Sequence, residues 1–195
     1  NNTGAAVVTP GNSFVLKSTF RGNDNSGDNG GAVRVVPVTG SADVPEPARF
    51  LDNMFFDNQA DNGGAIYVSG YMAAFKNCVF HGNKATNNGG AIYNDSGMLF
   101  LNHVSATQNS AVTGGVLATN GTGKSYISNS IMWDDGNDEI TRSTNSVVRI
   151  QCSAITSNGG TDPWSMSGVN PKFVDPDNGD LHLRADSPMI DRGCE

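Results

Sequence analysis

The strongest constraint on the fold is a short pattern that recurs along the chain at a nearly constant interval. Pairs of adjacent glycines begin at Gly30, Gly63, Gly89 and Gly114, at intervals of 33, 26 and 25 residues. A Phe-x-x-Asn element precedes the first three pairs, at residues 20–23, 55–58 and 80–83. Two markers that share one period indicate a structural unit of about 25 residues that repeats along the chain.

A unit of this length, with three short strand-like segments and three turns, is typical of one coil of a right-handed parallel β-helix. No window of about 11 residues has the apolar spacing of an amphipathic helix, so crossover helices are not expected. An antiparallel sandwich would also contain short strands and glycine-rich turns, but it would not keep equivalent residues at a constant interval. The sequence therefore predicts an all-β solenoid of roughly six to seven coils.

The repeat also predicts which side chains stack in the core. Coils of a parallel β-helix lie about 4.8 Å apart, so equivalent residues of successive coils form columns of like side chains. One apolar column is expected from the residues that follow the glycine pairs: Val33, Ile66, Ile92 and Leu117. A second is expected from phenylalanines one period apart: Phe50, Phe75 and Phe100.

Asparagines occupy two further positions of the repeat, and each position predicts a different role. One set follows the phenylalanine column and is expected to form a ladder of hydrogen-bonded amides: Asn77, Asn102 and Asn129. The other set is expected at turns with left-handed backbone, where asparagine and glycine are least penalised: Asn23, Asn58, Asn83 and Asn109.

The pattern predicts a single domain over residues 1–195. The coils are expected over residues 15–165 and a C-terminal cap over residues 166–195, because an uncovered end of the stack would expose strand edges. The longer first interval places about eight extra residues in a proline-rich stretch, residues 37–49, which we expect to form a loop inserted between two coils. Inserted loops on solenoids often bind ligands, and a loop with no binding role is an equal alternative.

Composition limits the partners of the chain. The formal net charge is −7 and the isoelectric point is about 4.7, which argues against nucleic acid or an anionic membrane as the partner. No apolar run approaches the roughly 18 residues that span a bilayer, so no direct membrane insertion of this segment is expected.

Three motifs follow one another toward the C-terminus: SNSIMWDDGNDEI (residues 128–140), VVRIQCSAI (147–155) and NPKFVDPDNGDLHLRADSPMIDRG (170–193). Their order resembles the end of bacterial secreted right-handed β-helix proteins with a choice-of-anchor terminal region. The FxxN…GGAIY units are similar to the repeats of polymorphic outer-membrane proteins and related adhesins. The resemblance covers essentially the whole chain and implies a β-helix that is secreted or displayed at a cell surface.

The three cysteines, Cys78, Cys152 and Cys194, are an odd number without a CxxC motif. In a secreted protein, a disulfide between Cys152 and Cys194 would attach the cap to the last coil. Free, buried cysteines are the equal alternative.

Two tyrosines one coil apart are the best candidates for ligand binding. Because side chains alternate along a strand, inward-facing Ile66 and Ile92 place Tyr67 and Tyr93 on the outer surface. Stacked exposed aromatic side chains form platforms for sugar rings or for a protein partner. Arg34 occupies the same column one coil earlier. An aromatic ladder that only stabilises the outer face of the sheet is the alternative.

Acidic residues cluster in the segment DDGNDE and form the best candidate metal site. The carboxylates belong to Asp134, Asp135, Asp138 and Glu139. Calcium takes oxygen ligands of this kind, and solvated loop acids are the alternative. A second acidic stretch, DPDNGD at residues 175–180, resembles a calcium loop, but a tight turn leading into a strand explains it better. No other cofactor is expected.

These features favour a noncatalytic extracellular module, structural or adhesive, that presents a side face and the 37–49 loop to a carbohydrate or protein at the cell surface. The alternative is a polysaccharide-acting enzyme, a lyase or glycoside hydrolase of the pectate-lyase-like β-helix type, with acids of the 134–139 loop contributing. Glycoside hydrolysis needs two carboxylates across a cleft, and Asp57 has only Gly82 or His81 one coil later, so no catalytic residue can be named. A stalk with no ligand is a third hypothesis.

Overall fold

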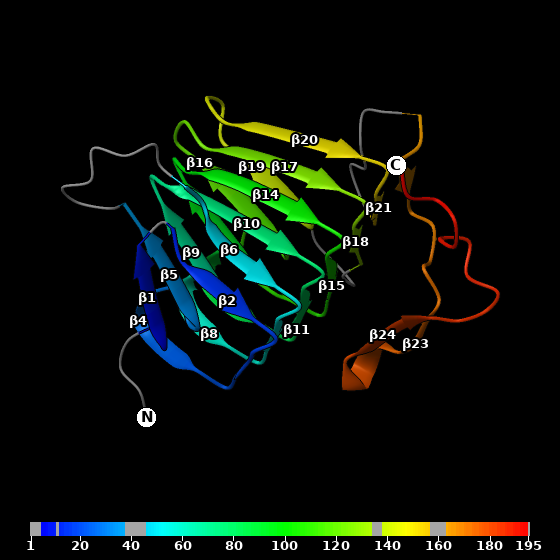
Figure 1. Cartoon of the computed structure of the whole chain (residues 1–195), viewed down its shortest axis with the longest axis horizontal. Coiled ribbons are helices and arrows are strands. Elements are labelled where there is room, and N and C mark those ends of the chain that lie inside the picture. Colours follow the sequence, from blue (N-terminus) through cyan, green and yellow to red (C-terminus); the bar gives the residue numbers. More distant parts are fainter. Residues whose placement is uncertain (1–4, 11, 38–45, 134–137, 157–162, 195) are drawn as a thin grey trace.

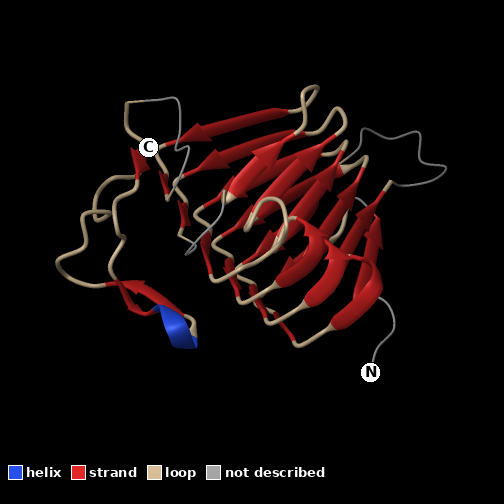
Figure 2. Cartoon of the chain, turned by 180° about the vertical axis from the view of Figure 1, so that it is seen from behind, coloured by secondary structure: helices blue, strands red, loops and turns tan. Residues whose placement is uncertain are grey.

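The computed structural model describes residues 5–10, 12–37, 46–133, 138–156 and 163–194 of the chain. These residues form short β-strands that wind into a stack of coils, with the strands of successive coils side by side (Figure 1 and Figure 2). Within the stack the neighbouring strands pair in parallel. The described residues contain no helix that is long and apolar enough to cross a membrane.

Three sheets run along the stack. Sheet A consists of β1 (Val7–Pro10), β5 (Val33–Val36), β9 (Ile66–Ser69), β13 (Ile92–Asp95), β16 (Leu117–Asn120) and β19 (Ile140–Arg142). Sheet B consists of β2 (Phe14–Leu16), β6 (Ala48–Leu51), β10 (Met72–Lys76), β14 (Met98–Asn102), β17 (Lys124–Ser128) and β20 (Val147–Gln151). Sheet C consists of β3 (Thr19–Arg21), β7 (Met54–Phe56), β11 (Val79–His81), β15 (Ser105–Thr107), β18 (Ile131–Met132), β21 (Ala154–Ile155) and β22 (Met166–Ser167).

A fourth, shorter sheet was not expected from the sequence. Sheet D consists of β4 (Asp24–Asn29), β8 (Gln59–Asn62) and β12 (Lys84–Asn88) and lies between sheets C and A along the chain. Only three strands were expected in each coil, and the segments of sheet D are polar and lack the apolar alternation of a strand. Side chains hold these strands in register: the amide of Asn88 donates to Asn62 Oδ1 at 2.8 Å, and that of Asn62 donates to Asn29 Oδ1 at 2.8 Å.

The predicted all-β parallel solenoid is confirmed. The stack amounts to about five complete turns, from β2 to β19, with β1 before them and β20, β21 and β22 after them. The number of complete turns is therefore smaller than the six to seven coils expected from the sequence. The strands of the stack extend beyond the expected coil limits at both ends, since β1 begins at Val7 and β22 ends at Ser167. Most of the expected 37–49 loop lies outside the described residues, and its last two residues already belong to β6.

The first predicted core column is confirmed. Val33 pairs with Ile66, Ile66 with Ile92 and Ile92 with Leu117, and all four side chains are fully buried. The column extends one residue further at each end, to Val7 and Ile140. Burying this many branched side chains in contact supplies the main driving force for stacking the coils.

The second predicted core column is correct for Phe50 and Phe75 and wrong for Phe100. The rings of Phe50 and Phe75 stack with centroids 4.5 Å apart. On the next coil Phe75 pairs with Leu101, so Leu101 occupies the core and Phe100 points outward, 37% exposed. The cause lies in β12, where the register with β8 shifts between Ala85 and Asn88 and the later coil gains one residue. A shift of one residue moves each following side chain to the opposite face of its sheet.

The roles predicted for the two sets of asparagines are exchanged in the structure. Asn58 and Asn83 are fully buried, and their amides donate to Asn83 Oδ1 at 2.9 Å and Asn109 Oδ1 at 2.8 Å. Asn23 joins the same ladder, because its amide donates to Asn58 Oδ1 at 2.7 Å. The left-handed positions are elsewhere and include Asn77 (φ 53°) and Asn129 (φ 50°), whereas Asn102 lies in β14. The buried ladder therefore follows the Phe-x-x-Asn element.

The C-terminal segment leaves the stack after β22 and forms an antiparallel hairpin of β23 (Phe173–Asp175) and β24 (Asp180–Leu183), joined by the 3₁₀ turn Pro176–Asn178. In Figure 1 this hairpin lies beside the middle of the stack, near β11, and not over the last coil. Gln108 Nε2 donates to Asp177 Oδ1 at 2.7 Å, and a Cβ on Gly179 would lie 3.2 Å from the ring of Phe56. The segment expected to cap the stack therefore runs back along the outer side of sheet C.

A disulfide between Cys152 and Cys194 attaches the end of this segment to the stack, as one of the two alternatives from the sequence predicted. The backbone N–H of Cys194 also donates to Asn129 Oδ1 at 2.8 Å. Cys78 is free and buried, and burial raises the pKa of its thiol to about 11. Cys78 therefore acts as a small core residue rather than as a nucleophile.

Replacing Asn83 by alanine should strongly destabilise the fold. The change removes three buried hydrogen bonds of the Asn83 carboxamide, to the carbonyl of Phe55 and to the carboxamides of Asn58 and Asn109. Each buried hydrogen bond lost in this way costs about 1 kcal/mol or more, so we expect a loss of roughly 3 kcal/mol in the free energy of unfolding, measured by denaturant titration.

Asn77→Gly is the matched control, because Asn77 is exposed and glycine adopts its left-handed backbone readily. Equal losses for Asn77→Gly and Asn83→Ala would contradict the assignment of the ladder.

Candidate functional site

The candidate site predicted from the sequence lies on the outer face of sheet A. Arg34 pairs with Tyr67, and Tyr67 pairs with Tyr93, on β5, β9 and β13. Their neighbours Ile66 and Ile92 are fully buried in the core. The structure therefore brings the three predicted residues together in one column, outside the core.

Tyr67 lies between Arg34 and Tyr93, which are themselves partly at the surface. The rings of Tyr67 and Tyr93 are stacked, with centroids 5.6 Å apart, and the guanidinium carbon of Arg34 lies 5.5 Å from the centroid of Tyr67. Tyr67 is only 8% exposed, whereas Tyr93 and Arg34 are partly exposed. The expectation that both tyrosine rings are exposed is wrong for Tyr67, because a cation and a second ring cover its faces.

Hydrogen bonds and charges hold this column in place. The hydroxyl of Tyr67 donates to Asp95 Oδ2 at 3.0 Å, and the guanidinium of Arg34 lies 3.6 Å from Asp28 Oδ1. Burial, with the hydrogen bond to Asp95, raises the pKa of Tyr67, and burial with the charge of Asp95 raises the pKa of Tyr93. Both rings therefore stay neutral at physiological pH.

Arg34 keeps one unused donor in this arrangement. Its Nε is buried and has no hydrogen-bond partner among the residues that the structure describes. A buried donor without a partner carries a desolvation cost. Because this atom is buried, a ligand would meet the partly exposed remainder of the Arg34 side chain and the partly exposed ring of Tyr93.

The predicted metal site is described only in part. Asp134 and Asp135 lie outside the described residues. Asp138 is exposed, whereas the side chain of Glu139 is 1% exposed, and their backbone carbonyls accept hydrogen bonds from Gly115 and from Val116 and Leu117. No group of three His, Cys, Asp or Glu side chains suited to a metal occurs within the described ranges. Calcium binding at Asp134, Asp135, Asp138 and Glu139 remains a prediction.

The second acidic stretch, residues 175–180, forms a tight turn that leads into a strand, as the sequence predicted. Asp175 and Asp180 pair at the base of the β23–β24 hairpin, and the amide of Asn178 donates to Asp175 Oδ2 at 2.8 Å. Gly179 ends the 3₁₀ turn with left-handed backbone, φ 79°.

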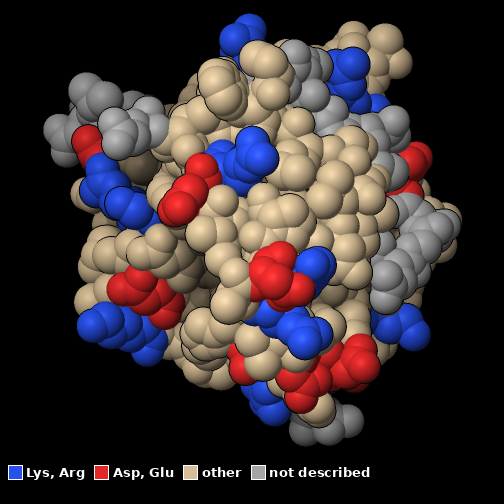
Figure 3. All heavy atoms as spheres, turned by 90° about the vertical axis from the view of Figure 1, so that its right-hand side faces the viewer, with Lys and Arg blue, Asp and Glu red and all other residues tan. Residues whose placement is uncertain are grey.

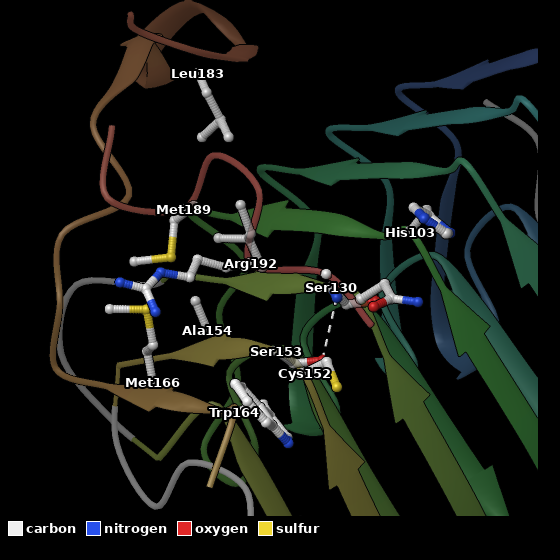
Figure 4. A pocket seen from close by; sticks show the side chains of 13 residues that line it. His103, Ser130, Cys152, Ser153, Ala154, Trp164, Met166, Leu183, Met189 and Arg192 are labelled. Carbon is white, nitrogen blue, oxygen red and sulfur yellow. Dashed lines mark hydrogen bonds between the residues drawn. The ribbon is translucent and has the colours of Figure 1, made fainter. Parts of the chain in front are cut away.

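A cavity of about 280 Å³ lies where the C-terminal segment meets sheet C. Its lining includes Trp164, Met166, Met189 and Arg192, and Figure 4 shows the side chain of Arg192 between those of the two methionines. The backbone N–H of Ser130 donates to Ser153 Oγ at 3.1 Å across its floor. The sequence did not indicate this cavity, because it forms between segments far apart in the chain.

The outer face of sheet B carries a further group of side chains that sequence reasoning missed. Phe100 on β14 stacks on Tyr126 on β17, with centroids 5.3 Å apart and planes 14° apart. Phe100 was expected in the core because a constant interval of 25 residues was applied across β12. The alternation of β14 held the correct signal, since an outward Phe100 lets both Leu99 and Leu101 point inward.

Comparison with known families gives one match. Residues 54–69 and 77–95 match the Chlamydia polymorphic membrane protein repeat. These residues include β7, β8 and β9 of one coil and β11, β12 and β13 of the next, so the match covers the strands of sheets C, D and A in two successive coils. No curated protein and no solved structure matches the chain. The choice-of-anchor resemblance of the C-terminal region is not supported by a match.

The tyrosine column should make the protein sensitive to alkali. In the unfolded chain both tyrosines ionise near their ordinary pKa of 10.0, and the folded state raises both values. Above pH 10 the native state retains protons that the unfolded state has lost, so the free energy of unfolding falls as the pH rises. In Tyr67→Phe this fall should be smaller, which denaturant titration at several alkaline pH values would measure.

Tyr126→Phe, on sheet B, controls for removing a hydroxyl elsewhere. An alkaline loss of stability that is the same in Tyr67→Phe and in the wild type would show that Tyr67 is not the buried group.

Proposed function

We propose that this chain is a noncatalytic segment of a cell-surface β-helix protein, structural and adhesive, which presents side faces of the solenoid to a carbohydrate or protein partner. The β-helix itself is a scaffold, because each coil repeats the same backbone and leaves the outward side chains free to vary. Residues 54–69 and 77–95 match a repeat named for polymorphic membrane proteins, and this supports an extracellular location.

The single observation that carries the binding part of the proposal is the column of Arg34, Tyr67 and Tyr93. Tyr67 positions the other two, because its ring touches both side chains and its hydroxyl is held by Asp95. Arg34 supplies a partly exposed cationic side chain and Tyr93 supplies an apolar surface to a ligand. Side chains held in place before binding lose little conformational entropy when the ligand arrives.

One position in the stack, beside Asp57, supports the noncatalytic part of the proposal. The position that stacks on Asp57 in the next coil is Gly82, whose Cβ, if present, would lie 2.5 Å from Asp57 Oδ1. A glycine there cannot provide the second carboxylate that hydrolysis of a glycosidic bond requires.

Binding to arrays of glycans and of surface proteins tests the proposal. We expect a ligand whose affinity falls on the order of tenfold in Tyr93→Ala, because the exposed aromatic surface is lost, and by a similar factor in Arg34→Ala. Lys84→Ala is the matched control, since Lys84 is exposed on sheet D, away from the column. Antibodies against the chain should label intact cells of the source organism.

Binding that is equal in Tyr93→Ala, Arg34→Ala and Lys84→Ala would exclude this face as the site. Labelling only after the cells are broken would contradict the surface location.

A further inference from the structure

The outer face of sheet B differs in charge from the rest of the molecule. Its six strands contain four cationic residues and no aspartate or glutamate. The cations are Arg49, Lys76, Lys124 and Arg149. The chain as a whole has 19 acidic and 12 basic residues, so this sheet opposes the overall charge of −7.

Sheet D has the opposite character. The three strands of sheet D contain Asp24, Asp28 and Asp61, with Lys84 as their one basic residue. Figure 3 shows the side of the molecule that carries the C-terminal segment, where acidic and basic side chains lie next to one another. In Figure 1 the strands of sheet B lie side by side across the front of the molecule. The four cations of sheet B therefore lie together on one face.

Three of these cations surround the aromatic pair of Phe100 and Tyr126. Lys124 precedes Tyr126 by two positions on β17 and therefore points to the same side of the sheet. Arg149 on β20 pairs directly with Tyr126, and Lys76 on β10 pairs with Asn102, two positions after Phe100.

These three cations are exposed and uncompensated. None of Lys76, Lys124 and Arg149 forms an ion pair with a carboxylate in the described part of the chain, whereas Arg49 pairs with Glu46. Uncompensated cations on an acidic protein create a local positive potential that attracts an anionic partner.

The aromatic pair gives this face an apolar centre. Phe100 pairs on its other side with Ala74, whose small side chain leaves that face of the phenyl ring uncovered by the sheet. Phe100 is 37% exposed, a large value for an aromatic side chain in the middle of a sheet. Beside the rings runs a polar column in which Asn102 Nδ2 donates to Ser128 Oγ at 2.7 Å. Apolar rings, hydrogen-bonding side chains and cations therefore alternate across the strands.

We propose that the outer face of sheet B, centred on Phe100 and Tyr126 and flanked by Lys76, Lys124 and Arg149, binds an acidic polysaccharide built from uronic acids. A pyranose ring has an apolar face that packs against an aromatic side chain and hydroxyl groups that bond to Asn102 and Ser128. Each uronate also carries a carboxylate, which pairs with lysine or arginine. The residues of this face come from several adjacent strands, which suits an extended polymer.

The proposal assigns a ligand class to a second face and rests on the surface location proposed above. It uses none of the residues of the Arg34, Tyr67 and Tyr93 column. A neutral glycan would leave the cations unused, and an acidic peptide or anionic lipid would leave the uncovered ring of Phe100 without a matching flat apolar surface. Anionic partners of these kinds serve as comparisons in the test.

The test measures binding of the purified chain to polygalacturonate, with dextran, polyglutamate and anionic lipid vesicles as comparison ligands. The first variant is Lys76→Gln/Lys124→Gln/Arg149→Gln. Its matched control, Lys84→Gln/Arg142→Gln/Arg192→Gln, removes three exposed cations from other parts of the molecule and changes the net charge equally. The second variant, Phe100→Ala, removes the aromatic surface without altering the charge. All four changed positions of the sheet B variants are exposed, so both variants should fold.

We expect binding to polygalacturonate that weakens as salt is added and no comparable binding to dextran. The sheet B triple variant should bind on the order of tenfold more weakly, and the control triple variant should bind nearly as the wild type. Phe100→Ala should lose affinity for polygalacturonate by a similar factor.

Absence of binding to polygalacturonate, or equal losses in the two triple variants, would overturn the proposal. So would binding of polyglutamate or of vesicles as tight as that of polygalacturonate and unchanged in Phe100→Ala, since the face would then recognise negative charge alone. Tyr93→Ala should bind polygalacturonate normally. Loss of ligand binding at the Arg34, Tyr67 and Tyr93 column can therefore be distinguished from loss of polygalacturonate binding at sheet B.

Discussion

The structure depends on parallel main-chain hydrogen bonding between successive coils, because the register of that pairing decides which side chains are buried. A coil alone has no core, and its apolar side chains are covered only when the next coil lies directly above it. The column from Val7 through Ile66 and Ile92 to Ile140 shows this arrangement along sheet A. The buried amides of Asn58, Asn83 and Asn109 support the same register at the turn after sheet C, because they bond to their counterparts in adjacent coils.

The fold could be predicted from the sequence because the stacking of equivalent side chains is what produces the repeat. A side chain that touches its equivalent favours like residues, and like residues at a constant interval are visible without coordinates. The sequence predicted sheet D poorly, because those strands are held by hydrogen bonds between polar side chains such as Asn62 and Asn88 rather than by apolar alternation. The path of the C-terminal segment was also beyond sequence reasoning, since its contacts with Phe56 and Gln108 join distant parts of the chain.

The candidate sites, like the fold, were predicted only in part from the sequence. The alternation of Ile66 and Tyr67 was enough to place the tyrosines outside the core, but not to reveal that Arg34 and Tyr93 would cover both faces of Tyr67. Phe100 was assigned to the core because the additional residue in β12 is invisible to a constant interval. That one residue turns Phe100 outward beside Tyr126 and produces the aromatic centre of a basic face. Irregularities in a repeat are thus where a solenoid can gain a binding surface without changing its scaffold.

Cysteine cross-linking across β10 and β14 tests this register most directly. Equivalent Cα atoms of adjacent parallel strands lie about 4.8 Å apart, within the range that a disulfide spans. The register that includes the additional residue pairs Ala74 with Phe100, with both side chains outward. Mild oxidation should therefore join the cysteines of Ala74→Cys/Phe100→Cys and leave those of Ala74→Cys/Leu99→Cys unjoined, because Leu99 points inward. Ready cross-linking of the second pair and none of the first would contradict the account.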